Sequence, residues 1–376
     1  MTSNRLSPSA LRTVVQVDSL DDLTARRLVE LFRGEESLQP NAPDGLCQVD
    51  PRDGAVITYN SARARRPHDY GKRADIGLPN AEAYCPICDG KTTGAIDVAP
   101  LSDGFTFINK NMFPVLYLEG DVAAGAPPTD PTAGSPIGGL HLLQWTSTVH
   151  AHDFHNMPLA DVEIVLRRLA RLEGLLLGGA ETILGRPGPA YVLVIKNYGP
   201  LVGGSLAHGH QQIALSSVMP RRMADNARFE EQHCEPFAAF MLRENPAELT
   251  VRDYGAARLV VPYFMRRPYD MMLLARDTSR RYLSELDDAE IGALAAAWQD
   301  ATRAVLDVMP RIGRQPAYNV TVSNGPGAGL YVEFLPYTQE TGGLEHLGLW
   351  ACQNNPADVA RDLRATIAKW RDGEPS

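Results

Sequence analysis

The stretch KNYGPLVGGSLAHGHQQIALS, residues 196–216, determines how this sequence is interpreted. An apolar run ends just before it, a glycine-containing loop follows, and two histidines separated by one glycine lead into a second apolar run. Short apolar runs bounded by glycine-rich turns are typical of strands. Because alternate side chains of an extended segment share a face, His208, His210 and Gln212 are predicted to point the same way.

This polar face needs partners. Three polar side chains on one face of an otherwise apolar strand are costly to bury unless they contact a ligand, a metal ion or other polar groups. Gly203, Gly204 and Ser205 precede the histidines, and such a loop can bring backbone N–H groups close to a phosphate. A single histidine is more often structural, but this combination predicts a functional site.

The segment resembles the active segment of the galactose-1-phosphate uridylyltransferase-like family, nucleotidyltransferases of the histidine-triad superfamily that include ADP-glucose phosphorylase-like members. The family pattern is Asn, a glycine loop, Gly-x-Ser and then His-x-His-x-Gln. This chain matches it at Asn197, Gly203, Ser205, His208, His210 and Gln212. The resemblance implies that His210 is the nucleophile, supported by His208 and Gln212, and that the other matching residues contact the nucleotide. Gly209 departs from the pattern, because the family usually has Pro or Ser there.

Imidazole chemistry fits this role independently of the name. A neutral imidazole attacks well near pH 7 and leaves well again from a phosphoramidate, which splits one displacement into two easier ones. The second ring nitrogen of His210 is expected to keep its proton and to donate it to a backbone carbonyl of the loop. Related hydrolases carry a histidine in place of Gln212, whose amide can hold a phosphoryl oxygen but cannot deliver a proton efficiently. Transfer to an acceptor is therefore predicted over loss to water.

A basic turn, RARRP at residues 63–67, follows the first expected strand. By itself such a turn is usually a solvated surface feature. The resembling family has Arg-x-x-Arg-Pro at this place, and Arg63 and Arg66 fit its two arginines. The resemblance implies that both contact the nucleotide phosphates, for which the bidentate guanidinium group is well suited.

The segment CPIC at residues 85–88 has the spacing of a zinc knuckle, although a redox pair or two unrelated core cysteines would share it. The resemblance implies one structural zinc ion held by Cys85, Cys88, His208 and a histidine that precedes the long helix. The histidines available for this last place are His141, His150, His152 and His155. The run STVH at residues 147–150 resembles the family's Ser-Pro-x-His and favours His150, whereas counting back from Leu159 favours His155. We predict His150.

Two further segments carry weaker parts of the resemblance. FINKNMFP, residues 107–114, is similar to an Asn-x-aromatic-Pro stretch beside the base and ribose, which implies contacts from Asn109 and Phe113; a turn with a core aromatic is the alternative. Many uridylyltransferases also hold a second metal ion through His-x-His and a glutamate. This chain has Tyr331 and Glu333 at the first place and Asp225 or Asn226 near the second, so that site is predicted to be absent. The hexose-binding residues have no clear match, so galactose specificity is not expected.

The composition limits the partners. The chain has 376 residues, of which 44% are hydrophobic and 22% charged, as in ordinary globular proteins. A net charge of −9 argues against a nucleic-acid partner without excluding a small basic pocket. Five cysteines in so long a chain do not suggest a secreted disulfide framework. Neither a membrane-spanning run nor a signal-peptide core is found, so we expect a cytoplasmic protein without a membrane partner.

The order of elements predicts an α+β fold of duplicated histidine-triad-like halves, each an antiparallel sheet packed with a long helix. Strands are expected at 53–62, 105–108, 113–118, 139–145, 190–196, 258–263, 270–275, 317–323 and 329–335, and helices at about 22–32, 159–184, 220–245, 287–309 and 356–371. The predicted parts are an N-terminal extension (1–45), a catalytic domain (46–216) and a second domain (217–376). The Pro- and Gly-rich segment 121–139 is expected to be a loop that covers a site or a plain surface insertion.

These observations together predict a nucleotidyltransferase. It would act on a nucleotide sugar or related nucleotide by a ping-pong mechanism through a covalent nucleotidyl-His210 intermediate, with a sugar phosphate or phosphate as acceptor. With inorganic phosphate as acceptor it would be a nucleotide-sugar phosphorylase. A hydrolase or lyase working on the same intermediate, and a nucleotide-binding zinc protein without turnover, are the alternatives. A homodimer is compatible with the resemblance.

Overall fold

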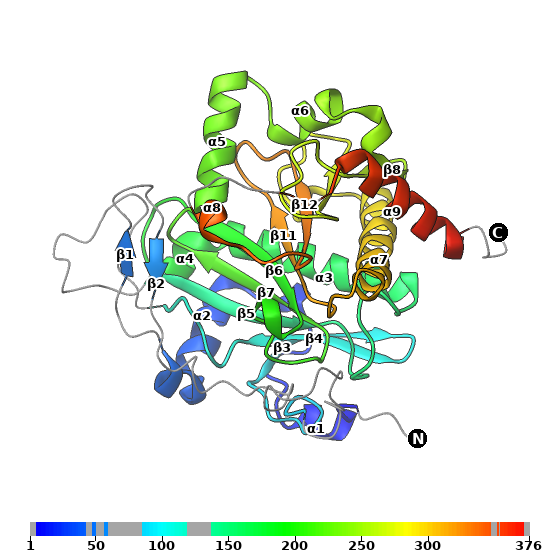
Figure 1. The fold of residues 1–376 in the computed structure, drawn as a ribbon. Coiled ribbons are helices and arrows are strands. Elements are labelled where there is room, and N and C mark those ends of the chain that lie inside the picture. The colour runs from blue at the N-terminus through cyan, green and yellow to red at the C-terminus, as the bar shows by residue number, and fades with distance from the viewer. Residues whose placement is uncertain are drawn as a thin grey trace.

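The structure, a computed structural model, describes residues 5–42, 47–49, 56–58, 85–118, 137–346, 352 and 354–371. The strands are β1 (Cys47–Val49), β2 (Val56–Thr58), β3 (Ala95–Leu101), β4 (Gly104–Lys110), β5 (Gly139–Trp145), β6 (Tyr191–Tyr198), β7 (His210–Ser216), β8 (Thr250–Asp253), β9 (Ala257–Val260), β10 (Met271–Ala275), β11 (Tyr318–Ser323) and β12 (Tyr331–Pro336). β1 and β2 pair separately, and the others form one antiparallel sheet of ten strands in the order β3-β4-β5-β7-β6-β11-β12-β10-β9-β8 (Figure 1).

The helices surround this sheet. They are α1 (Pro8–Arg12), α2 (Ala25–Arg33), α3 (Leu159–Gly178), α4 (Ala180–Leu184), α5 (Arg221–His233), α6 (Phe237–Glu244), α7 (Asp288–Arg311), α8 (Gly343–His346) and α9 (Pro356–Arg371), with short 3-10 turns between them. None of those in the described part of the chain is long and apolar enough to cross a membrane.

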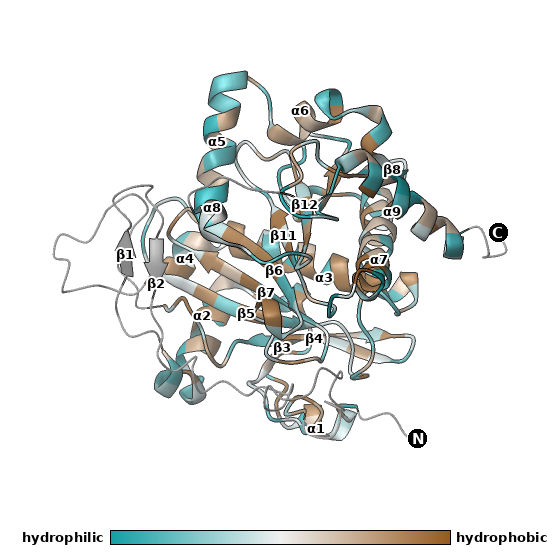
Figure 2. Cartoon of the chain, viewed as in Figure 1, coloured by the Kyte–Doolittle hydropathy of each residue, from teal (hydrophilic) through white to brown (hydrophobic). Residues whose placement is uncertain are grey.

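The main core lies between the sheet and the two long helices, α3 and α7, which contact each other. Strand alternation explains this arrangement: Ile213 and Leu215 of β7 pack in this core, whereas His210 and Gln212 project from the opposite face and line a cavity. α7 starts with a capping box, in which the Asp287 carboxylate accepts the backbone N–H of Glu290. The strands and long helices are largely hydrophobic, whereas α5 is hydrophilic (Figure 2).

The two halves of the sheet have the same strand order. In the first half, the successive strands β3 to β7 are arranged as first, second, third, fifth and fourth, and the long helix α3 lies between the third and fourth. In the second half, β8 to β12 follow the same order, with α7 at the same place in the chain. The halves join where β6 pairs with β11, with Asn197 opposite Asn319.

Several predicted elements differ in the structure. Residues 113–118 do not form the predicted strand, because the backbone N–H groups of Phe113 and Val115 donate to the side chains of Asn111 and His141. The helix predicted over 159–184 breaks at Gly179, where a Cβ would lie 2.2 Å from the Cβ of Ala25. The helix predicted over 220–245 divides into α5 and α6 around Cys234, which has a φ of 58°.

Three strands, β1, β3 and β8, were not predicted, and other predictions need smaller corrections. β3 carries Asp97 and was missed because a charged residue does not suggest a buried strand. β8 was missed because it is short. The helix predicted over 22–32 is α2, which begins at Ala25, three residues after the predicted Asp22, and the short α1 before it was not predicted. Most of the segment 121–139 lies outside the described residues, so the prediction of a covering loop stays a prediction.

The N-terminal segment packs on the first half of the sheet. The buried Asp97 carboxylate accepts the Leu20 backbone N–H at 2.9 Å and pairs with Arg168 of α3 at 2.6 Å. The buried ammonium group of Lys110 lies 2.9 Å from a carboxylate oxygen of Glu35. These contacts attach residues 5–42 to the strands that support the candidate site.

Candidate functional site

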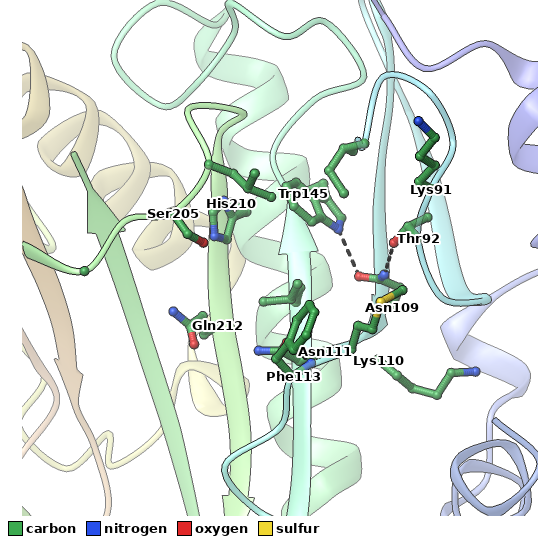
Figure 3. A pocket seen from close by; sticks show the side chains of 15 residues that line it. Lys91, Thr92, Asn109, Lys110, Asn111, Phe113, Trp145, Ser205, His210 and Gln212 are labelled. Carbon is green, nitrogen blue, oxygen red and sulfur yellow. Dashed lines mark hydrogen bonds between the residues drawn. The ribbon is translucent and has the colours of Figure 1, made fainter. Parts of the chain in front are cut away.

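His210 is the first residue of β7, and its imidazole lines a cavity of about 90 Å³ (Figure 3). The ring Nδ1 lies 2.8 Å from the backbone carbonyl oxygen of His208. A carbonyl can only accept, so Nδ1 carries the proton and Nε2 keeps its lone pair. This is the hydrogen bond predicted for a nucleophilic histidine, and it leaves Nε2 for a reaction.

Burial keeps this ring neutral. Removal from water lowers the pKa of His210 to about 4; the hydrogen bond to the His208 carbonyl opposes this change and the nearby Lys196 ammonium group adds to it. The ring packs against Trp145, with ring centroids 4.7 Å apart. A neutral, fixed imidazole with one available lone pair is suited to attack an electrophilic phosphorus atom.

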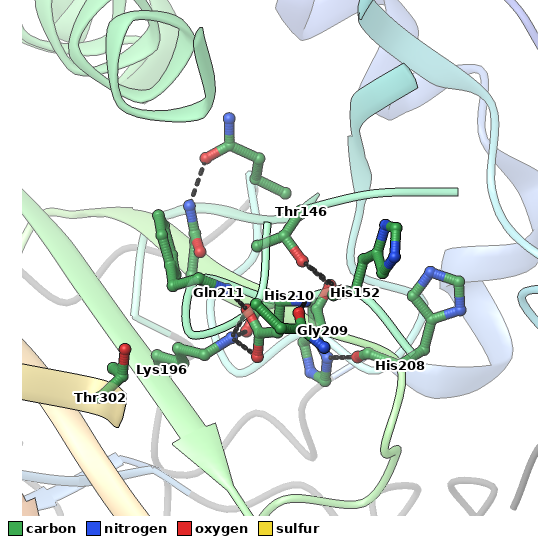
Figure 4. Close-up of polar contacts among 12 residues, drawn as sticks. Thr146, His152, Lys196, His208, Gly209, His210, Gln211 and Thr302 are labelled. Carbon is green, nitrogen blue, oxygen red and sulfur yellow. Dashed lines mark hydrogen bonds and ion pairs between the residues drawn. The ribbon is translucent and has the colours of Figure 1, made fainter. Parts of the chain in front are cut away.

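Buried polar side chains form hydrogen bonds to the backbone carbonyl groups of Gly209 and His210 (Figure 4). Lys196 Nζ donates to the His210 carbonyl oxygen at 3.1 Å and forms an ion pair with Asp153 at 2.7 Å. Burial raises the pKa of the Asp153 carboxyl group, but the Lys196 ammonium, the nearby His155 and the hydrogen bonds to Asp153 together outweigh burial and lower this pKa. Thr146 Oγ1 donates to the Gly209 carbonyl oxygen at 3.0 Å.

The same side chains explain why this chain has Gly209 where the family pattern has Pro or Ser. A Cβ at this position would lie 2.5 Å from Thr146 Oγ1 and 2.7 Å from Asp153 Cγ. Neither Ser nor Pro would fit without movement of these side chains, so a glycine is needed here. The prediction that His208, His210 and Gln212 share one strand face is wrong for His208, because β7 begins only at His210.

The imidazole of His208 instead belongs to a cluster with two cysteines. Candidate ligand atoms of Cys85, Cys88, His150 and His208 all lie within 4.8 Å of one another. His208 Nε2 donates to the Ser147 carbonyl oxygen at 2.7 Å, while Nδ1 lies 3.5 Å from Cys88 Sγ. A ring whose far nitrogen donates to a backbone carbonyl is oriented as metal-ligating histidines are. Two sulfurs and two imidazole nitrogens at this separation fit a tetrahedral metal ion.

His150, and not His155, completes this cluster. His150 Nδ1 lies 3.5 Å from Cys88 Sγ. The His155 ring instead lies edge-on to Tyr198, with ring centroids 6.3 Å apart. Within the cluster, hydrogen bonding, first from Cys88 and then from the two histidines, lowers the pKa of Cys85 against the effect of burial. A thiolate is the form that binds metal.

The cavity beside His210 also receives other predicted residues. Gly203, Ser205, Gln212 and Phe113 line it, and Gly203 has a φ of 87°, which favours glycine (Figure 3). A second cavity, of about 420 Å³, is lined by Gln212, Asn197 and mainly apolar residues. Gln212 therefore borders both cavities.

Asn109 lines the first cavity, but its amide is already engaged. Its Nδ2 donates to Thr93 Oγ1 at 2.9 Å and also to Thr92, and its Oδ1 accepts the Trp145 indole N–H at 2.9 Å. The neighbouring Asn111 lies in the same cavity beside His141. Residues 111–114 also read Asn-x-aromatic-Pro, and the contact proposed for Asn109 stays a prediction.

Sequence reasoning missed the contribution of β5 to the site. Trp145 pairs with His210 across the β5–β7 ladder, and Leu143 pairs with Gln212. Alternation along residues 139–145 could have placed His141, Leu143 and Trp145 on one face, but only the register shows that this face adjoins His210 and Gln212. Arg63 and Arg66 lie outside the described residues, and their proposed phosphate contacts stay predictions.

The positions discussed for a second metal site have other contacts. Tyr331 donates its hydroxyl proton to Asn226 Oδ1 at 3.0 Å. Glu333 lies 3.5 Å from the Arg222 guanidinium group. Asp225 contacts Arg221 at 2.8 Å.

Comparison with known proteins places this geometry in context. No family model matches the chain. The ADP-glucose phosphorylase of Arabidopsis thaliana is 22% identical over 351 residues, which cover 88% of this chain and 94% of that protein. The galactose-1-phosphate uridylyltransferase of Rattus norvegicus is 27% identical over 262 residues, which cover 66% of this chain and 65% of that enzyme.

Solved structures give the same result for the fold. A uridylyltransferase structure aligns over 86% of this chain and 98% of its own, with a TM-score of 0.66 and 20% identity. The predicted family resemblance is confirmed. An ADP-glucose phosphorylase from Arabidopsis thaliana, solved with bound ADP-glucose, covers 86% of this chain and 99% of its own, with a TM-score of 0.60 and 16% identity.

Proposed function

We propose that this chain is a nucleotidyltransferase that carries a nucleoside monophosphate on His210. One observation carries the proposal: the His210 Nδ1 proton is held by the His208 carbonyl, so the Nε2 lone pair remains for the cavity that His210 shares with Gln212 and Ser205. The similarity in sequence to a uridylyltransferase and an ADP-glucose phosphorylase supports the same class of reaction.

The proposed reaction has two displacements. In the first, His210 Nε2 attacks the α-phosphorus of a nucleotide sugar, the N–P bond forms, and the bond to the sugar phosphate breaks with its electron pair. In the second, a phosphate oxygen of the acceptor attacks the same phosphorus and the lone pair returns to Nε2. The Nδ1–H bond to the His208 carbonyl stabilises the positive charge that the ring carries between the two steps.

The residues present favour transfer over hydrolysis. Gln212 has an amide where a hydrolase would need a proton donor, so it can hold a phosphoryl oxygen without activating water. The two cavities that meet at Gln212 support a substrate with one group on each side of a phosphate. A sugar phosphate or inorganic phosphate would serve as acceptor. With inorganic phosphate the reaction would be a phosphorolysis, as the name of the Arabidopsis relative, ADP-glucose phosphorylase, indicates for that enzyme.

We also propose one structural zinc ion at Cys85, Cys88, His150 and His208. Four protein ligands leave no open position, so the ion would brace the segment that precedes His210 and would take no part in bond making. Cys88→Ala is expected to lose the ion and to lower the melting temperature. Elemental analysis of the purified variant and wild type checks this. A wild-type protein that binds no zinc when reconstituted with it would contradict the proposal.

The common strand order of the two half-sheets supports the further proposal that residues 46–216 and 217–376 are related histidine-triad-like halves. In this arrangement the first half carries the chemistry, and the second half supports it through the β6–β11 pairing.

The experiment that tests the function is intact-mass measurement after incubation with ADP-glucose or UDP-glucose in the absence of acceptor. Wild type is expected to gain the mass of one nucleotidyl group, which added phosphate or a hexose phosphate removes. His210→Ala is expected to gain none while keeping its fold. The same substitution at His233, an exposed histidine on α5, is the matched control. An active His210→Ala variant would exclude this mechanism.

A further inference from the structure

His141 is a buried histidine of β5 that the proposed mechanism does not use. Its side chain is 3% exposed and projects from the same face of the sheet as Trp145. Its ring contacts the Val115 backbone N–H through Nδ1 at 3.2 Å and Gln212 Oε1 through Nε2 at 3.0 Å. The His141 ring therefore contacts the side-chain amide of Gln212, the residue that borders both cavities.

These two contacts determine the protonation of the His141 ring. A backbone N–H can only donate, so Nδ1 must accept and cannot carry a proton. A neutral imidazole has one N–H group, and here it is at Nε2. The Nε2–H group therefore donates to Gln212 Oε1, and the ring is held in one tautomer by the backbone.

The neighbouring Asn111 also lies beside this ring. Its Oδ1 accepts the Phe113 backbone N–H at 2.9 Å, which turns its NH₂ group toward His141. This Nδ2 lies 3.4 Å from Nδ1, the ring nitrogen that has a lone pair, and 3.1 Å from Nε2. The turn at residues 111–115 thus contacts the imidazole through the Asn111 amide and the Val115 backbone.

We propose that His141 is a positioning residue for nucleotidyl transfer, which fixes the Gln212 amide so that its NH₂ group, and not its oxygen, faces the reacting phosphate. The inference rests on the proposed function. The two ends of a glutamine amide are nearly equal in shape, so only a hydrogen-bond partner decides which end faces the cavity.

The consequence for the reaction is electrostatic. With Oε1 held by His141, both Gln212 N–H bonds are directed away from that ring and are available to a phosphoryl oxygen. A reversed amide would present an oxygen lone pair to the phosphate and would repel the charge that the transition state develops. His210 and Gln212 lie side by side along β7, so one phosphoryl group can contact both (Figure 3).

Two substitutions of similar size separate orientation from packing. In His141→Asn, the side-chain amide can replace Nδ1 and accept the Val115 N–H, but it does not reach Gln212. In His141→Gln, the longer amide can place an N–H group near the Nε2 position and donate to Gln212 Oε1. We expect His141→Asn to slow nucleotidyl transfer about 10- to 100-fold, as loss of an orienting partner does, with little change in KM. His141→Gln is expected to recover most of the rate.

A double-mutant cycle with Gln212→Ala completes the test. The rate of His210 labelling by ADP-glucose or UDP-glucose is measured for His141→Asn in the wild-type and Gln212→Ala backgrounds, with melting temperatures as the control for folding. If His141 acts through Gln212, its substitution costs little further once the amide is gone. Equal losses in both backgrounds, with normal labelling of wild-type His210, would overturn this inference alone. No labelling of wild-type His210 would overturn the proposed function itself.

Discussion

The two halves of the sheet have the same strand order and differ in the side chains that their equivalent strands present. β7 begins with His210 and carries Gln212 two residues later, and β12 begins with Tyr331 and carries Glu333 two residues later. His210 presents a ring nitrogen to a cavity, whereas the Tyr331 hydroxyl is bound to Asn226 of α5. The same strand position therefore faces a cavity in one half and is hydrogen-bonded to a helix in the other.

The neighbouring strands differ in the same way. Gln212 lies diagonal to His141 across its ladder, and Glu333 lies diagonal to Asp270, which immediately precedes β10. The first pair is neutral and connected by a hydrogen bond. The second consists of two carboxylates, with Arg267 near Asp270 and Arg222 near Glu333. An amide held with its NH₂ group outward suits a phosphate, and a carboxylate pair does not.

Substitution of His210, the proposed nucleophile of the first half, should have the largest effect on nucleotidyl transfer. In His210→Asn, the side-chain amide can keep the hydrogen bond to the His208 carbonyl while the Nε2 lone pair is lost. We expect no nucleotidyl adduct and a transfer rate lower by at least about 10⁴-fold, as for other enzymes without their nucleophile. Intact-mass and rate measurements with ADP-glucose and UDP-glucose check this. An adduct on the variant with the same added mass as in the wild type would contradict it.

A charge exchange sharpens the comparison between the halves. Gln212→Glu gives β7 the residue that β12 has, and removes the NH₂ donor while adding a negative charge beside the phosphate. The transfer rate is expected to fall about 10²–10³-fold, as on loss of a transition-state donor. Glu333→Gln, the mirror change, should leave the rate nearly unchanged. Similar losses in both variants, measured under saturating nucleotide sugar, would show that the two halves share the chemistry.

Local chemistry explains which of these features the sequence could predict. Asp287 caps α7 and Pro356 starts α9, because capping and proline geometry depend on a few adjacent residues. The cysteine spacing and the alternation after His210 likewise depend on neighbours in the chain. The cysteine spacing, together with the family resemblance, predicted the cluster of Cys85, Cys88, His150 and His208 that the structure brings together. The role of His210 stays a prediction.

Contacts between distant segments could not be predicted. His141 faces Gln212 only because β5 pairs with β7 in one register, and a shift of one residue would turn it to the other face. Asn109 and Asn111 look alike in sequence, and only the structure shows that the Asn109 amide contacts Thr92, Thr93 and Trp145. The Asn111 amide lies instead beside His141. Register and side-chain satisfaction therefore limit prediction of the site more than motif recognition does.

The carboxylate pair of the second half predicts a pH dependence of stability. Burial chiefly, with a smaller contribution from Glu333, raises the pKa of Asp270 to about 7. The folded protein then binds more protons than the unfolded chain between the ordinary aspartate pKa and about 7, so this residue costs stability as pH rises through that range. Asp270→Asn should remove this cost and raise the free energy of unfolding at pH 8 by a few kcal/mol. Urea titrations at pH 5 and pH 8 check this, and a larger gain at pH 5 would refute the sign.

The smallest effect is expected from loss of the hydrogen bond between Tyr331 and Asn226 in the second half. Tyr331→Phe removes the hydroxyl that donates to Asn226 and keeps the ring, so the free energy of unfolding should fall by about 1 kcal/mol, the usual loss of one hydrogen bond. Transfer should continue at the wild-type rate, because Tyr331 lines neither cavity at His210. Denaturant unfolding and the His210 labelling rate are measured on the same sample. A labelling rate that fell with stability largely unchanged would mean that the Tyr331 hydroxyl acts on the phosphate from the second half, and the assignment of chemistry to one half and support to the other would be wrong.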